Sequence, residues 1–174
     1  MWKFIFGENS ALVHQYVHQA EQQFTKQSPA SPVLRFDAED GQGAWRDFIT
    51  ELDLGFFDTA KLIILQNPGS LGDTFWQEQK AWLTEAPKND AVTVLFVESA
   101  KPEKKAAWYK LLVAATTEQQ EFTKKTQKPE ELLEAVWQQF SGQKLSAGMV
   151  RTLAERTGGD SYALVTAAQK VMTY

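Results

Sequence analysis

The chain of 174 residues contains no cysteine and no long hydrophobic run. The lack of cysteine excludes a disulfide framework and thiolate metal sites, and it is typical of proteins in a reducing cytosol. No apolar stretch approaches the ~20 residues that a membrane span requires. The start, Met1–Gly7, is too short for a signal peptide and lacks a small-residue cleavage site. We therefore expect a cytoplasmic protein.

The chain also lacks an excess of positive charge. Its formal net charge is −4 and its pI is near 5.3, which argues against strong, autonomous binding of nucleic acid. Two lysine groups could make a local contact with DNA phosphates, at Lys101, Lys104, Lys105 and at Lys124, Lys125, Lys128. Because Glu103 and Glu121 lie among them, a solvated face is the favoured interpretation.

Apolar runs alternate with helical stripes along the first two thirds of the chain. We expect strands at residues 2–6, 33–36, 62–65, 91–97 and 120–123. Between them, periodic apolar residues predict a helix capped by Asn9 or Ser10, one around residues 45–52, a tryptophan-rich helix around 75–83, and one at 104–113. Strands that alternate with helices imply an α/β fold with a parallel sheet.

The last third has a purely helical pattern. Pro129 suits the first position of a helix, and Ser146 is a candidate cap ahead of Met149. We therefore expect an α/β domain at residues 1–141 and a small helical domain at residues 142–174.

The predicted sheet lacks the residues of a nucleotide site at both places where they are required. After the first strand, the turn Gly7-Glu8-Asn9-Ser10 has one glycine, no lysine and a carboxylate where an anion would lie. After the third strand, Gln66-Asn67-Pro68 offers no magnesium-binding carboxylate. We expect the fold of an ATPase with an empty active site, and no cofactor.

Other catalytic or metal chemistry has little support. His14 and His18 are four residues apart, but no glutamate of a zinc-protease motif lies between them and no third ligand suggests itself. The chain has no Gly-x-Ser-x-Gly elbow. We expect neither a metal site nor a catalytic residue.

Phe56 and Phe57 lie side by side in a predicted connection before the third strand. Neighbouring side chains on an extended backbone point to opposite sides, so one short loop can hardly bury both rings in the same core. A ring left on the surface is an anchor for a partner's pocket. The alternative is that both rings close the end of the sheet.

Four segments, in order and across nearly the whole chain, carry a family resemblance: Phe4–Glu8, Leu34–Glu39, Leu54–Leu62 and Leu153–Asp160. With them the chain resembles the delta subunit of the bacterial DNA polymerase III clamp loader. The resemblance implies an AAA+-like module without a functional phosphate loop, followed by a small helical lid.

The resemblance also implies a function in DNA replication. Such a subunit is a non-catalytic part of the DNA polymerase III holoenzyme that binds the sliding clamp, the beta subunit, and helps to open it. The clamp is gripped by a pair of apolar residues after the second helix, which are Phe56 and Phe57 here, with Leu54 beside them. Relatives are longer and assemble with other loader subunits, and so indirectly with primed DNA, through a collar domain that this chain lacks.

Two other functions stay open at this point. One is a nucleotide-dependent phosphotransferase or ATPase with a degenerate phosphate loop, which a nucleotide titration would reveal. The other is an adaptor that binds proteins through exposed rings of Trp76 and Trp82. Deep burial of those rings would instead make them part of the core.

Overall fold

The structure is a computed structural model, and it describes residues 1–52, 60–86, 91–123 and, beyond these, 146, 148–149, 151–152 and 156. The chain divides into two compact units, Met1–Thr123 and Lys124–Tyr174. In the second unit Ser146 Oγ accepts the backbone N–H of Met149 at 3.3 Å, which confirms the predicted cap. The predicted helix from Pro129 and the predicted boundary at residue 141 lie outside the described residues.

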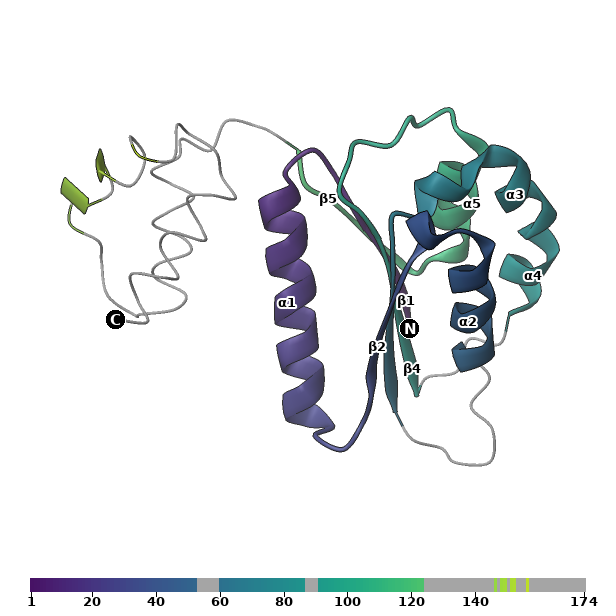
Figure 1. Cartoon of the computed structure of the whole chain (residues 1–174), viewed down its shortest axis with the longest axis horizontal. Helices are drawn as coiled ribbons and strands as arrows, with labels where there is room; N and C mark the ends of the chain where they lie inside the picture. Colours follow the sequence, from purple (N-terminus) through teal and green to yellow (C-terminus); the bar gives the residue numbers. More distant parts are fainter. Residues whose placement is uncertain are drawn as a thin grey trace. The chain divides into compact units, whose positions relative to one another are not determined.

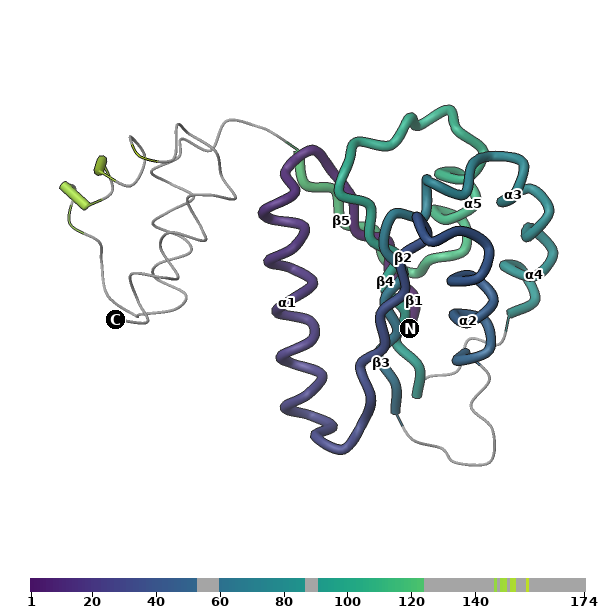
Figure 2. Tube along the Cα trace, viewed as in Figure 1, coloured from purple at the N-terminus to yellow at the C-terminus, as the bar shows by residue number. Residues whose placement is uncertain are grey.

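The first unit contains a five-stranded parallel sheet with the strand order β2-β3-β4-β1-β5, as Figures 1 and 2 show. The parallel α/β fold predicted from the alternating pattern is confirmed. The strands are β1 (Trp2–Phe6), β2 (Val33–Asp37), β3 (Lys61–Gln66), β4 (Val92–Glu98) and β5 (Glu118–Glu121).

The last strand was expected at residues 120–123 and lies two residues earlier. Its sequence is polar, because β5 is an edge strand that packs little of its surface, so apolar periodicity could not fix its register. The register is set by contacts with β1: Lys3 pairs with Glu118 across the strands, and their side chains form a 2.7 Å ion pair.

Helices cover both faces of the sheet (Figure 1). One face carries α1 (Ser10–Gln27), and the other carries α2 (Gln42–Leu52), α3 (Gly72–Glu78), α4 (Lys80–Glu85) and α5 (Ala107–Ala115). Asn9 caps α1 as predicted, because its Oδ1 accepts the N–H of Leu12 at 3.2 Å. Within the described part of the chain, no helix is long and apolar enough to cross a membrane.

Helix α5 begins at Ala107, three residues after the predicted start at Lys104. The reason is a contact that the local sequence does not contain. Asp73 Oδ1 on α3 accepts the N–H of Trp108 at 3.0 Å, and so satisfies a first-turn donor of α5 from another element.

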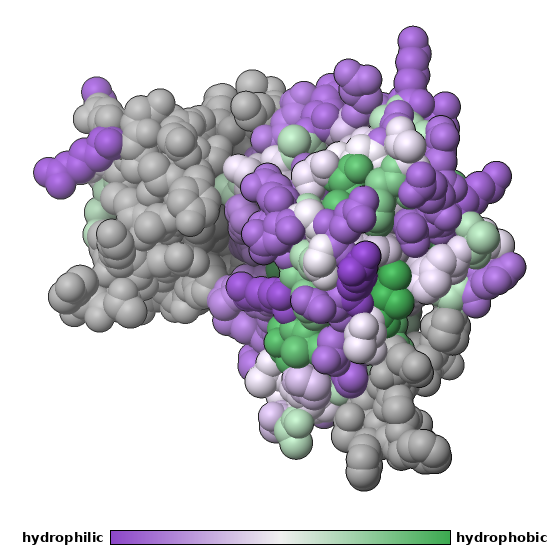
Figure 3. Space-filling view, turned by 45° about the vertical axis from the view of Figure 1, so that its right-hand side comes forward, coloured by the Kyte–Doolittle hydropathy of each residue, from purple (hydrophilic) through white to green (hydrophobic). Residues whose placement is uncertain are grey.

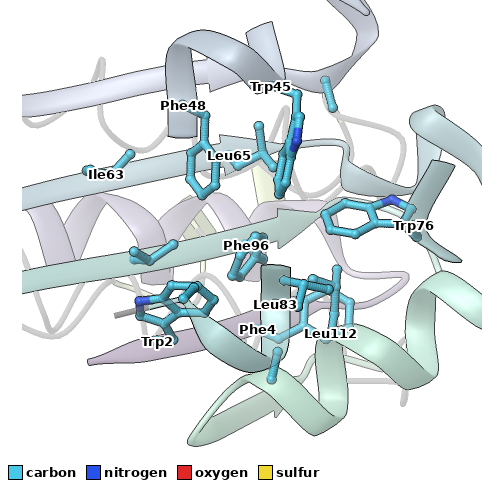
Figure 4. Close-up of a cluster of buried hydrophobic side chains, with 14 of the residues drawn as sticks. Trp2, Phe4, Trp45, Phe48, Ile63, Leu65, Trp76, Leu83, Phe96 and Leu112 are labelled. Atoms are coloured by element: carbon cyan, nitrogen blue, oxygen red, sulfur yellow. The ribbon is translucent and has the colours of Figure 1, made fainter. Parts of the chain in front are cut away.

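The larger core cluster is aromatic (Figure 4). The Trp45 ring lies 5.1 Å from Phe48, 5.1 Å from Trp76 and 5.0 Å from Trp82, measured between ring centroids. Trp76 and Trp82 are six residues apart, which would place them on different sides of one straight helix. The predicted tryptophan-rich helix is therefore two helices, α3 and α4, which meet at Gln79 and let both rings reach Trp45.

Candidate functional site

The carboxyl ends of parallel strands are the usual place for a ligand in an open α/β sheet. In this protein the turn after β1 is already filled by the chain itself. The N–H of Gly7 donates to the carbonyl of Glu98, and the N–H of Asn9 donates to the carbonyl of Phe122, both at 3.2 Å. Two backbone donors that a phosphate cradle would need are thus bonded within the fold.

Gly7 also lies against the neighbouring strand end. Its φ is +145°, and a Cβ placed on it would come 2.0 Å from the carbonyl oxygen of Phe122. The glycine that sequence analysis treated as the remnant of a phosphate loop is thus required for close packing of the chain.

The lysines that follow β4 make ion pairs. Lys101 Nζ lies 3.2 Å from Glu8 Oε1, and Lys104 Nζ lies 3.1 Å from Glu121 Oε2. The hydrogen bond to Glu121 raises the pKa of Lys104. A DNA phosphate would compete with these carboxylates, whereas Lys105 is exposed. Lys124, Lys125 and Lys128 lie outside the described residues, and contact with DNA stays a prediction.

The end of β3 is occupied by an amide instead of a metal-binding carboxylate. Asn67 adopts a left-handed conformation with φ of 52°. Its Nδ2 donates to both carboxylate oxygens of Asp37 at the end of β2, at 3.0 and 3.2 Å. Asn67 therefore joins two strand ends and neutralises none of the charge on Asp37.

Glu98, the last residue of β4, is a functional candidate that the sequence analysis missed. It is 9% exposed, and its Oε2 accepts the N–H of Gly69 at 3.1 Å. Burial raises the pKa of Glu98, and the charges of Glu39 and Asp37 add to this rise, although hydrogen bonds from the N–H groups of Gly69 and Ala100 oppose it. A carboxylate directly after an apolar strand was the available signal, but the predicted strand ended at Val97.

Glu98 lies in a pocket of about 610 Å³ at this edge of the sheet. Four carboxylates line the pocket, from Glu39, Asp73, Glu98 and Glu103, together with the ammonium of Lys101 and the indole of Trp108. We call this the edge pocket. Its charge is the opposite of what a nucleotide phosphate requires.

Metal ligands do not gather at this pocket or elsewhere in the part of the chain that the structure describes: no group of three or more His, Asp or Glu residues could hold a metal ion. His18 has other neighbours. Its Nε2 lies 2.9 Å from the side-chain nitrogen of Gln22, and its Nδ1 lies 3.9 Å from Glu21 Oε2.

The other predicted site, Leu54, Phe56 and Phe57, lies outside the described residues. Its two flanks are described. Lys61 at the start of β3 donates from Nζ to Glu51 near the end of α2, at 3.3 Å to the carbonyl oxygen and 3.0 Å to Oε2. These flanks lie at the amino end of β3, the edge of the sheet opposite the edge pocket.

The tryptophans expected of an adaptor surface belong to the core. Trp76 is fully buried and its Nε1 donates to the carbonyl of Pro68 at 2.8 Å. Trp82 is partly buried and stacks on Trp2, with ring centroids 5.9 Å apart. On the face shown in Figure 3, hydrophobic residues of the described part reach the surface only in small patches among hydrophilic ones. The adaptor reading loses its supporting feature.

Comparison with known proteins rests on structure alone, since no family model and no curated protein matches the sequence. The Bacillus subtilis DNA clamp loader delta protein (YqeN) superposes with a TM-score of 0.63 at 14% identity, over 99% of this chain and 52% of that one. The chain has a clamp loader delta-like fold. It spans about half the length of that protein. Saccharomyces cerevisiae RIF2 matches with a TM-score of 0.46 at 10% identity, over 88% of this chain and 62% of that one.

Proposed function

We propose that this chain is a non-catalytic, clamp-loader-type subunit that binds a sliding clamp in DNA replication. The observation that carries the proposal is the turn after β1, whose Gly7 and Asn9 donors are bonded to the fold in a chain with a delta-like fold. A subunit that has given up phosphate binding keeps the scaffold for binding proteins. Assembly with other loader subunits, and through them contact with primed DNA, belongs to the same proposal.

Phe56 and Phe57, flanked by Leu54, are the proposed clamp-binding residues. A fully buried aromatic side chain contributes about 1.5–3 kcal/mol through its apolar area, so two adjacent rings can dominate a small interface. The Lys61–Glu51 contacts support this assignment, because they fix the two elements between which the rings are carried.

Clamp opening would follow from differential affinity. A partner shifts an equilibrium between two states only as far as it binds one state more tightly than the other. This subunit would therefore favour a spread clamp over a closed clamp without hydrolysing nucleotide itself.

The test is a calorimetric titration of the chain with the sliding clamp of its source organism. We expect Phe56→Ala/Phe57→Ala to weaken binding by at least about 2 kcal/mol, a typical hot-spot loss, with little change in thermal stability. Phe24→Ala is the matched control, because that ring packs against the α1 side of the core and its loss should lower stability and leave affinity intact. Unchanged affinity with collapsed stability in the double variant would mean that the rings are core.

The alternative of a nucleotide-dependent phosphotransferase or ATPase gains no supporting contact from the described residues. The turn that would hold phosphate presents the carboxylate of Glu8, paired with Lys101.

A further inference from the structure

The edge pocket has a chemistry that the proposed clamp contact does not use. It lies at the carboxyl ends of the strands, whereas the flanks of Phe56 and Phe57 lie at the amino end of β3. We propose that the edge pocket binds a guanidinium group, offered either by an arginine side chain of a partner protein or by a small guanidinium compound.

The balance of charge in the pocket calls for a cation. Of the five charged side chains that line it, four are carboxylates, and the one ammonium, Lys101, is already paired with Glu8. Among the residues that the structure describes, none of the carboxylates of Glu39, Glu98 and Glu103 forms an ion pair. The pocket therefore carries negative charge that the fold leaves without a counter-ion.

Glu98 provides the second, independent observation. It is nine-tenths buried, lines the pocket, and accepts backbone hydrogen bonds but meets no basic side chain in the described part of the chain. A buried carboxylate without a counter-charge is costly. Burial accordingly raises the pKa of Glu98. A cation in the pocket would remove this cost and hold Glu98 ionised.

The ring of Trp108 makes guanidinium the best-suited cation. Trp108 and Glu98 converge over Gly69: a Cβ on this glycine would lie 2.8 Å from Trp108 Cζ2 and 2.9 Å from Glu98 Oε2. An aromatic face next to a carboxylate suits a planar cation that can stack on the ring and donate in its own plane to the acid. A compact ammonium uses this arrangement less well.

The size of the pocket agrees with an organic cation. Pockets for small organic ligands typically measure about 300–1,000 Å³, and the edge pocket measures about 610 Å³. A metal ion needs several ligands at one point, and the acidic residues described here do not form such a group.

The experiment titrates the full chain by calorimetry at low ionic strength with four probes: agmatine, a tri-arginine peptide, tri-lysine and tri-citrulline. We expect saturable, one-to-one binding of a guanidinium probe, at least tenfold weaker binding of tri-lysine and none of tri-citrulline. Agmatine alone reaching full affinity would indicate a free small molecule, and a gain with tri-arginine would indicate a protein side chain. Absence of saturable guanidinium binding, or equal binding of tri-lysine, would overturn the proposal.

Variants locate the site. Glu98→Gln keeps the shape of the side chain and should weaken guanidinium binding at least tenfold, and Trp108→Leu should weaken it severalfold. Glu85→Gln on α4 changes the net charge equally at an exposed position and should leave affinity within twofold. Equal losses in Glu98→Gln and Glu85→Gln would mean general attraction to an acidic protein, and would also overturn the proposal. Clamp affinity, measured alongside, should be unchanged in Glu98→Gln, so failure here is distinct from failure of the proposed function.

Discussion

Arg35 on the edge strand β2 holds Glu21 of α1 through two hydrogen bonds. Arg35 Nε donates to Glu21 Oε1 at 2.7 Å, and Nη2 donates to Oε2 at 2.6 Å. The Glu21 side chain is 11% exposed, whereas that of Arg35 is 57% exposed. The carboxylate has thus left water, and the guanidinium compensates its charge and ties the edge of the sheet to α1.

Arg35→Met should destabilise the fold by about 1.5–3 kcal/mol, because it removes charge-assisted hydrogen bonds from a buried carboxylate. Urea denaturation measures the change. The double variant Glu21→Met/Arg35→Met should lose less than the single variant, since no buried charge remains. Lys104→Met is the control at a more exposed ion pair, where about 0–1 kcal/mol is expected. Equal losses in Arg35→Met and Lys104→Met would contradict the interpretation.

Gly7→Ala should destabilise the protein by about 3 kcal/mol or more, because it combines a strained backbone with overpacking. The added Cβ would meet the carbonyl oxygen of Phe122 at 2.0 Å. Gly43→Ala is a matched control within α2, where a Cβ meets nothing within 4 Å. It should stabilise the protein by about 0.5–1 kcal/mol. Thermal unfolding of both variants checks this pair, and a mild effect at Gly7 would show that the turn is not tightly packed.

Glu98→Gln should make the protein more stable at neutral pH, and the advantage should disappear in acid. The folded protein raises the pKa of Glu98 above the model value of 4.5, so the folded state binds the proton more tightly than the unfolded state. Wild-type stability therefore falls as pH rises from the unfolded pKa through the folded pKa. Denaturation of the two proteins across this range gives the difference, with Glu85→Gln as the charge control. A difference that stays constant with pH would rule out titration of Glu98 as its cause.

Titration with ATP and magnesium should give no saturable binding. The Gly7 and Asn9 donors are bonded to Glu98 and Phe122, and the neighbouring pocket is lined by carboxylates that repel phosphate. Calorimetry and equilibrium dialysis provide the measurement. Micromolar, magnesium-dependent affinity would instead favour the enzyme alternative.

Much of the fold was predictable because the signals were local. The apolar run before Gly7, the Asn9 cap and the stripe that contains Val13 and Val17 were enough to place β1 and α1. Prediction failed where a distant contact sets the boundary, as at α5, whose start is fixed by Asp73, and at β5, whose polar register is fixed by pairing with β1. The absence of a phosphate cradle was also visible in sequence, since it depends on which residues follow a strand.

The amino-acid sequence by itself determined the alternation of strands and helices, the parallel sheet and the unsuitability of the Gly7 turn for phosphate, since periodicity, caps and residue chemistry are properties of neighbours along the chain. The tertiary structure alone decided that the aromatic rings of α2, α3 and α4 meet at Trp45. It also decided that Glu98 and Trp108, ten positions apart, converge over Gly69. The physical reason is that a parallel sheet brings strand ends together from distant parts of the chain, and burial and charge at that edge depend on the sum of those neighbours.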